Sequence, residues 1–247
     1  MNDYAQIPGG KNELKPLLYQ FHSSYPFKIW SKYRWFRNSC LPSELPSLNE
    51  GKKWLTIVDR LGAPGDALIT ANVIRCIKED YSALRINCIT PHPELIRLDP
   101  NIDSINQPET FYSFDSTYWE LIVRKEKSQN IIEHNMNRLG IEKYNYKAAY
   151  YLSKEEKEWA KQEISEFKNP LLAICTKSKE SVKNWPVEYW TELLKSLITK
   201  FSIIQLGDKA EPKFQGVRSF AGKLSMRESA ALLSQAKLFI GPDSLLM

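Results

Sequence analysis

The sequence lacks long hydrophobic runs. Its 247 residues are 43% hydrophobic, but the apolar stretches are only a few residues long. A helix that crosses a bilayer needs about 20 mostly apolar residues, so we expect no membrane span. The start of the chain does not resemble a secretory signal. These absences predict a cytoplasmic, globular protein with one large or two modest domains.

Cysteine and histidine are scarce and scattered. The four cysteines show no paired spacing, which favours reduced, buried thiols over a disulfide framework. The three histidines lie far apart in the chain, which argues against a zinc site. The net charge of +5 is mild and suits an anionic partner without identifying one.

The most informative stretch is WLTIVDRLGAPGDALIT. An apolar strand at 54–58 runs into a Gly/Pro turn at 60–66, and a helical pattern starts at once. This places the carboxylate of Asp66 at a helix N-terminus, on the edge of a parallel sheet where α/β proteins bind ligands. A helix N-terminus stabilises a carboxylate, so we expect a lowered pKa for Asp66. Two roles stay open at this point, a general base or a helix cap.

Strands and helices alternate along the rest of the chain. We predict further strands at 84–90, 118–124, 169–176, 201–208 and 237–244. We predict helices at 127–141, 153–167, 187–200 and 224–236, with capping boxes at Ser153/Glu156 and Ser225/Glu228, Gly140 as a stop and Pro186 in a first turn. Such alternation indicates βαβ units, and hence an α/β chain with two Rossmann-like halves.

The expected organisation has three parts. Residues 1–52 form a basic, aromatic extension and linker, 53–150 a first Rossmann-like domain and 151–247 a second. The sequence stops just after a strand that needs a covering helix, so we expect the second domain to be incomplete. The extension suits a helix packed on the next domain or a segment resting on an anionic membrane. Single-stranded nucleic acid is disfavoured, because no RNA-binding motif accompanies the extension.

Four sequence blocks, in order within residues 54–247, carry a resemblance. They are IVDRLGAPGDALITANVIRCIKEDYSALRINCIT, KNWPVEYWTELL, IIQLGDKAE and AGKLSMRESAALLSQAKLFIGPDS. Together they resemble glycosyltransferase family 9, the heptosyltransferases that build the inner core of bacterial lipopolysaccharide. The resemblance implies a GT-B fold, in which two Rossmann-like domains face each other across a cleft. The first domain takes the acceptor and the second the nucleotide sugar.

The resemblance also implies an inverting reaction without metal or cofactor, and no D-x-D motif accompanies the candidate site residues. It makes Asp66 the general base. Lys183 in KNWP would hold the donor diphosphate, together with the hydroxyls of Thr176 and Ser178. The alternative for Lys183 is a solvated surface lysine in a basic loop.

Further donor contacts follow from the last two blocks. Glu211 occupies the place of an acidic residue that contacts ribose hydroxyls in the family, although Asp208 is close enough to confuse the assignment. Asp243 and Ser244 match the start of the family's D-[ST]-G-x-x-H segment. Leu245 stands where glycine is usual, and the histidine position falls beyond the last residue. These departures predict an incomplete donor site.

Acceptor contacts are less defined. Arg60 and Gly65 are the positions that we expect to meet the acceptor, Arg60 through an anionic group. Arg60 equally suits an ion pair with Asp59 or Asp66. We expect Trp185 and Trp190 to be core and staple residues rather than sugar platforms.

The leading hypothesis is a glycosyltransferase that moves a heptose or related sugar from a nucleoside diphosphate to a lipid-linked saccharide. ADP-heptose is the expected donor because it is typical of the family. The extension would hold the enzyme near the anionic inner leaflet, and we expect no nucleic-acid partner. The alternative is a catalytically inactive, truncated family member that binds a saccharide or a partner protein.

Overall fold

The computed structural model describes residues 54–107, 112–125 and 128–246, so the interpretations of residues 1–52 lie outside the described residues. The chain divides into two compact units between Tyr151 and Leu152, and each unit is described by itself. Among the described residues, none of the helices combines the length and hydrophobicity that a bilayer crossing needs.

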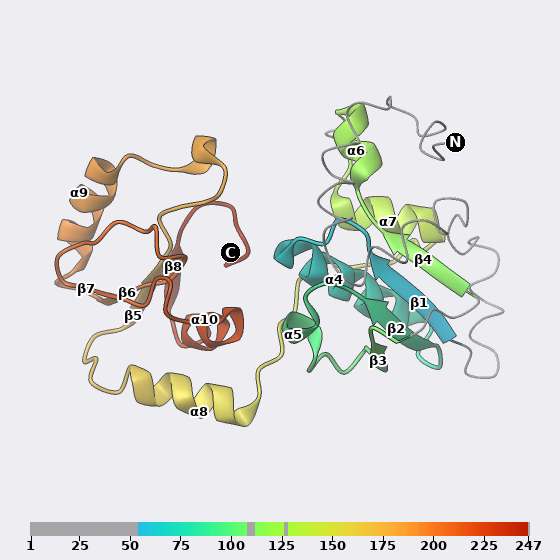
Figure 1. Cartoon of the computed structure of the whole chain (residues 1–247), viewed down its shortest axis with the longest axis horizontal. Helices are drawn as coiled ribbons and strands as arrows, with labels where there is room; N and C mark the ends of the chain where they lie inside the picture. The colour runs from blue at the N-terminus through green and yellow to red at the C-terminus, as the bar shows by residue number, and fades with distance from the viewer. Residues whose placement is uncertain (1–53, 108–111, 126–127, 247) are drawn as a thin grey trace. The chain divides into compact units, whose positions relative to one another are not determined.

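Unit 1 is built on a parallel sheet of four strands in the order β3-β2-β1-β4 (Figure 1). Its elements, in chain order, are β1 (Trp54–Asp59), α4 (Pro64–Asp80), β2 (Arg85–Ile89), α5 (Pro93–Ile96), β3 (Ser104–Ile105), β4 (Tyr112–Ser116), α6 (Trp119–Arg124) and α7 (Ile131–Leu139). The predicted strands at 54–58 and 84–90 and the helix after the first of them are confirmed. The strand β4 was not predicted.

The core of unit 1 lies between its sheet and α4. Leu55 and Ile57 of β1 and Ile86 of β2 are fully buried, and they belong to one apolar cluster with Ile74 and Ile77 of α4. A parallel strand is covered on both faces, which is why β1 is apolar at nearly every position instead of alternating with polar residues. This packing fixes the N-terminal end of α4 beside the carboxyl end of β1.

The predicted strand at 118–124 is wrong, because this segment forms the helix α6. The apolar run that suggested a strand fits a short helix equally well. The Thr117 hydroxyl accepts a hydrogen bond from the backbone N–H of Trp119 (3.1 Å), and this turns the chain into the helix. Lys125 ends it in the left-handed conformation (φ 52°). The fourth position of the sheet belongs to β4, whose sequence YSFDS is partly polar.

Unit 2 repeats this topology, with a parallel sheet in the order β7-β6-β5-β8. Its elements are α8 (Lys154–Glu163), β5 (Leu171–Ile174), the 3₁₀ helix η3 (Ser181–Lys183), α9 (Val187–Leu197), β6 (Ser202–Gln205), β7 (Val217–Ser219), α10 (Met226–Leu233) and β8 (Leu238–Ile240). All the strands and helices predicted for this part are confirmed, while β7 and η3 were not foreseen.

The two faces of the second sheet carry separate cores. Leu172 and Ile174 of β5 pack with Trp190 and Leu194 of α9 on one face. The alternate residues of β5 pack with α8 and α10 on the other, since successive side chains of a strand point to opposite faces. Both faces of the central strand β5 are therefore covered, whereas β8 at the edge of the sheet leaves Leu238 exposed.

The helix termini of unit 2 follow the predicted capping chemistry. Ser153 accepts a hydrogen bond from the N–H of Glu156 (3.1 Å), whose carboxylate accepts in return from the N–H of Ser153 (2.8 Å). Ser225 and Glu228 form the same pair of bonds at α10. In unit 1, Gly140 ends α7 with φ 67°, as predicted.

A buried ion pair joins α8 to α10. Arg227 is 6% exposed and donates from Nε to Glu156 Oε1 (2.5 Å) and from a terminal nitrogen to Glu156 Oε2 (2.6 Å). We predict that Arg227→Ala lowers the free energy of unfolding of unit 2 by about 2 kcal/mol, because it leaves the half-buried carboxylate of Glu156 without its cation. Urea unfolding measures the change. Lys161→Ala is the control, because its pair with Glu158 is exposed and should contribute less than about 1 kcal/mol. Equal losses in the two variants would contradict the prediction.

Candidate active site

Each sheet has one topological switch point. In unit 1 the first strand, β1, lies between β2 and β4. The strands that follow it in the sequence are therefore added first on one side of β1 and then on the other. In unit 2, β5 lies in the same way between β6 and β8. Open α/β sheets bind ligands beyond the carboxyl ends of the strands at such points. The predicted site residues follow β1 in unit 1, and β5, β6 and β8 in unit 2.

The turn after β1 is held by hydrogen bonds from separate segments. Gly62 has φ 72°, a conformation that glycine adopts without strain, and its N–H donates to Asp59 Oδ1 (2.9 Å). The Thr90 hydroxyl, just after β2, donates to Asp59 Oδ2 (2.8 Å). The Nε2 of His92 bonds the carbonyl of Gly62 (3.1 Å). The turn is therefore fixed before any ligand binds.

Asp66 lies in the first turn of α4 and is only 8% exposed. Its Oδ2 accepts from the backbone N–H of Ala63 (3.0 Å), and its Oδ1 accepts from the hydroxyl of Tyr118 (2.8 Å). One carboxylate oxygen thus caps the N-terminus of α4, and the other bonds a residue in the segment after β4. The cap and the chemical role are compatible, because each carboxylate oxygen can accept more than one hydrogen bond.

The predicted lowering of the Asp66 pKa is wrong. Burial raises the pKa of Asp66 above its ordinary value of 3.8, because the charged form loses water. Hydrogen bonds from Tyr118 and Ala63 and the charge of His92 act in the opposite direction and do not cancel this effect. A buried carboxylate with a raised pKa is a stronger base than a solvated one.

A second carboxyl group lies beneath the turn. Asp59 is fully buried, and burial raises its pKa to about 7, against the hydrogen bonds from Gly62 and Thr90. The negative charge of Asp66 raises it further. The two carboxyl groups are therefore coupled, and ionisation of one disfavours ionisation of the other.

The two predicted acceptor residues have different surroundings. Arg60 is 9% exposed and its terminal nitrogen contacts both carboxylate oxygens of Asp115 in β4 (2.9 Å each). The expected pair with Asp59 or Asp66 is wrong, since Asp115 is the partner. The Nε of Arg60 is buried and has no hydrogen-bond partner among the described residues. A Cβ added at Gly65 would meet no atom within 4 Å, so the surface there is open.

In unit 2 the loop after β5 is organised by Glu211. Its carboxylate accepts from the backbone N–H groups of Thr176 and Lys177 (3.0 Å each), from the Thr176 hydroxyl and from the Gln205 side chain (3.0 Å). Gly207, at φ 122°, leaves it room, because a Cβ there would lie 2.7 Å from Glu211 Oε1. The two predicted donor-binding residues Thr176 and Glu211 are therefore in contact, and they bond each other.

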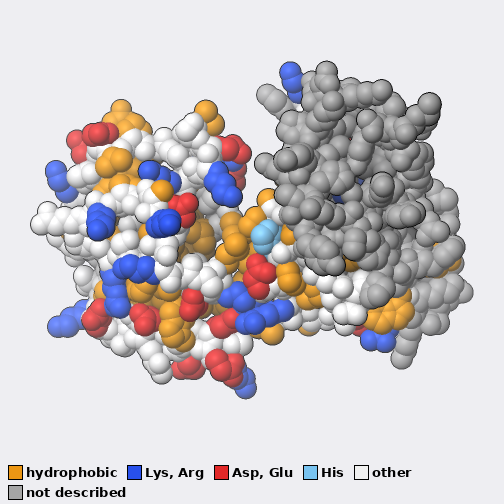
Figure 2. Space-filling model, in the orientation of Figure 1, with side chains coloured by type: hydrophobic (Ala, Val, Ile, Leu, Met, Phe, Trp, Pro, Cys, Tyr) orange, Lys and Arg blue, Asp and Glu red, His pale blue; other side chains and the backbone are white. Residues whose placement is uncertain are grey.

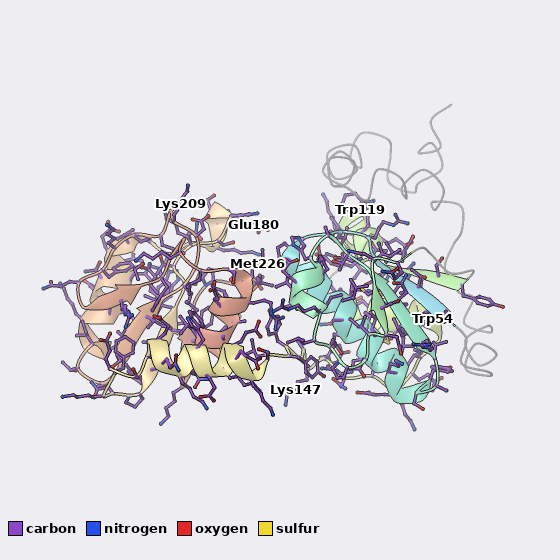
Figure 3. All side chains as sticks on the ribbon, turned by 60° about the horizontal axis from the view of Figure 1, so that its bottom comes forward. Trp54, Trp119, Lys147, Glu180, Lys209 and Met226 are labelled. Atoms are coloured by element: carbon purple, nitrogen blue, oxygen red, sulfur yellow. The ribbon has the colours of Figure 1, made fainter. Side chains whose placement is uncertain are left out.

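Two of the predicted donor-binding residues of unit 2, Lys183 and Asp243, contact each other. The Lys183 ammonium lies 3.1 Å from Asp243 Oδ2 and 3.2 Å from Glu180, whose place before η3 is marked in Figure 3. Asp243 and then Glu180 raise the pKa of Lys183, so it stays cationic at neutral pH. Asn184 fixes the preceding loop, because its side chain accepts from the N–H of Ser178 (2.6 Å) and donates to its carbonyl (3.1 Å).

Two further residues of unit 2 complete the description. The hydroxyl of Ser244 is buried and has no hydrogen-bond partner within the described part of the chain. The predicted core position is confirmed for Trp190, which is 3% exposed, and is wrong for Trp185, which is 56% exposed. Its ring lies 5.6 Å, centroid to centroid, from that of the buried Trp190.

On the face of unit 2 drawn in Figure 2, basic and acidic side chains are interspersed. Within the described ranges, no three His, Cys, Asp or Glu residues are grouped so that they could hold a metal ion.

Tyr118, His92, Thr90 and Asp59 were not proposed from the sequence. Each lies at or just after the carboxyl end of a strand, which is a usable signal in an α/β chain. For Tyr118 this signal was missed, because residues 118–124 were predicted to be a strand.

A family model described as glycosyltransferase family 9 (heptosyltransferase) matches residues 114–247, more than half of the chain. The chain belongs to glycosyltransferase family 9. The predicted family, the α/β fold of GT-B type and the glycosyltransferase class are confirmed. Among curated proteins, none matches the sequence.

Solved structures support the fold of this family 9 chain. A family 9 glycosyltransferase from Veillonella parvula is 13% identical, with a TM-score of 0.64 over 79% of this chain and 77% of that chain. The ADP-heptose lipopolysaccharide heptosyltransferase II of E. coli is 15% identical, with a TM-score of 0.56 over 78% and 80%. The E. coli heptosyltransferase WaaC, solved with ADP, is 14% identical, with a TM-score of 0.55 over 78% and 82%.

The coupled carboxyl group of Asp59 predicts a pH-dependent stability. Because its folded pKa is raised from 3.8 to about 7, its contribution to stability is complete below pH 4 and is lost as pH rises toward 7. We expect the free energy of unfolding of Asp59→Asn, relative to the unchanged chain, to rise by about 4 kcal/mol between pH 4 and pH 8. Urea unfolding at a series of pH values measures this difference. A difference that stays constant with pH would contradict a neutral, buried Asp59.

Proposed function

We propose that this family 9 chain transfers a heptose, or a related sugar, from a nucleoside-diphosphate sugar to a saccharide acceptor with inversion. The observation that carries the proposal is the buried carboxylate of Asp66 at the switch point of unit 1, oriented by two hydrogen bonds and made more basic by burial. Residues 53–150 would take the acceptor and residues 151–247 the nucleotide sugar.

The proposed reaction is a single displacement. Asp66 takes the proton of an acceptor hydroxyl while that oxygen bonds to the anomeric carbon, on the face opposite the leaving nucleoside diphosphate. The bond between the anomeric carbon and the phosphate oxygen breaks, and its electron pair stays with the diphosphate. Gly65 offers an open surface next to the base, where an acceptor sugar can approach.

Unit 2 supplies the positive charge that the leaving group needs. An ammonium group has three N–H donors, and in Lys183 they face Asp243 and Glu180. A donor diphosphate would take over part of this coordination and gain charge as the sugar leaves. This electrostatic role allows transfer without a metal ion, so we expect activity to survive EDTA. The buried hydroxyl of Ser244 and that of Ser178 are the nearby neutral donors that we propose for the phosphates.

The donor and acceptor classes are proposed from the relatives. Heptosyltransferase II is described with ADP-heptose and lipopolysaccharide, and WaaC was solved with ADP. We therefore propose ADP-heptose as donor and a lipid-linked lipopolysaccharide-core saccharide as acceptor, used at the cytoplasmic side of an anionic membrane. For Glu211 we propose a contact with the ribose hydroxyls through an oxygen that also holds the Thr176 loop.

The donor site is tested by calorimetry. We expect ADP-heptose to bind the unchanged chain, and Lys183→Ala to weaken this binding by about 10-fold to 100-fold, the effect of one charge-assisted hydrogen bond. Lys195→Ala removes the same charge from an exposed position late in α9 and should leave affinity unchanged. UDP-sugars and GDP-sugars are the specificity controls. Equal affinity in both variants would remove Lys183 from the proposed site.

The base is tested by transfer kinetics. Asp66→Asn keeps the shape of the side chain but cannot take a proton, so we expect kcat to fall by about a thousandfold while ADP-heptose binds as before. Asp80→Asn, at the exposed end of the same helix, should have normal activity. Transfer is measured as ADP release that depends on a lipopolysaccharide-core acceptor. Donor binding without any transfer by the unchanged chain would instead support an inactive, saccharide-binding family member.

A further inference from the structure

Tyr118 is placed beside Asp66 by the pairing of β1 with β4. In this parallel pair Asp59 lies opposite Ser116, so Tyr118 follows the end of β4 at the level of the turn after β1. The N–H of Arg60 donates to the Ser116 carbonyl (3.1 Å), which joins the ends of β1 and β4. The Thr70 hydroxyl donates to the Ser116 hydroxyl (3.0 Å). Thr70 belongs to α4, the helix that carries Asp66.

The phenol of Tyr118 therefore reaches Asp66 from across the switch point. It is half-buried, and its hydroxyl donates to Asp66 Oδ1 at 2.8 Å. The other oxygen, Oδ2, is held by the Ala63 N–H at 3.0 Å. With one donor on each oxygen, rotation of the carboxylate about its Cβ–Cγ bond would break both bonds.

We propose that Tyr118 is a positioning residue, which fixes the orientation of the Asp66 carboxylate and sets its basicity through the hydrogen bond to Oδ1. This inference rests on the proposed function, because it assigns a partner to the proposed base. The acceptor hydroxyl gives its proton to a lone pair of Asp66 that Tyr118 and Ala63 leave available, and the phenol keeps its own proton throughout. The Asp66 carboxylate becomes a carboxylic acid in that step.

The charge balance around Asp66 explains why one phenol matters. Burial raises the pKa of Asp66, while Tyr118 is first among the groups that lower it, before Ala63 and His92. The other ionisable groups around the turn are Asp59, Arg60 and His92, and each has partners of its own. Asp59 bonds Thr90 and Gly62, Arg60 bonds Asp115, and His92 contacts Gly62 and Glu94. Loss of the Tyr118 hydroxyl should therefore move the Asp66 pKa upward, and the neighbouring Asp59, whose ionisation disfavours that of Asp66, acts in the same direction.

The test compares Tyr118→Phe with Tyr81→Phe in the full chain. Tyr81 lies at the far end of α4 and packs on the same apolar core. The pKa of Asp66 is measured by carbon-13 NMR of labelled carboxyl groups, with Asp66→Asn to identify the resonance. We expect Tyr118→Phe to raise this pKa by about one pH unit and Tyr81→Phe to leave it unchanged. A 3-fluorotyrosine at position 118, a stronger donor, should lower it.

Kinetics provide the second measurement. Transfer needs ionised Asp66, so kcat/KM falls as pH drops through its pKa. In Tyr118→Phe we expect this acid limb to move to higher pH by the same number of pH units as the Asp66 pKa that NMR measures. The plateau kcat should fall about tenfold, because the base is less well oriented, with KM for the donor unchanged.

The outcomes separate the two proposals. An Asp66 pKa that does not rise in Tyr118→Phe overturns the role of Tyr118, and so does an acid limb that stays in place while the NMR value moves. If the unchanged chain transfers no sugar, the proposed function fails. The NMR titrations of the phenylalanine and fluorotyrosine variants then still decide whether Tyr118 controls Asp66.

Discussion

The hydrogen bond from the Gly62 N–H to the buried Asp59 carboxyl group is the contact on which the unit 1 site depends. It closes the turn between β1 and α4, and this turn sets the position at which α4 begins. Thr90 and His92 attach the same turn to the segment after β2. The position of Asp66 is thus set by the sheet edge and does not need a ligand to form.

Two effects compete at Asp66, and their sizes explain why its pKa rises. A helix N-terminus contributes only about 0.3 to 1 kcal/mol to an exposed carboxylate. Removal of a carboxylate from water costs several kcal/mol, and Asp66 is only 8% exposed. The turn, the phenol of Tyr118 and the helix offset part of this cost. What remains favours proton uptake, which a general base requires and a simple helix cap would not need.

Local rules in the sequence were sufficient for most elements and for the position of Asp66 at a helix N-terminus. Capping boxes at Ser153 and Ser225 and the stop at Gly140 depend on neighbouring residues, and the structure confirms them. Contacts between distant segments could not be predicted in this way. Arg60 pairs with a residue 55 positions away in a strand that was not predicted. The run at 118–124 is apolar enough for a strand or a helix, and only the position of β4 decides between them.

The same strand order places different ionisable groups after the strands of the two units. At the switch point of unit 1 the turn after the first strand presents a carboxylate whose burial favours proton uptake. In unit 2 the loop after the first strand presents Lys183, and the segment after the fourth strand presents its partner Asp243, which together with Glu180 raises the pKa of Lys183. A proton acceptor and a cation are the two kinds of group that the proposed displacement at a sugar diphosphate would use. Because each unit fixes its own group by internal hydrogen bonds, a substitution in one should leave the other's geometry intact.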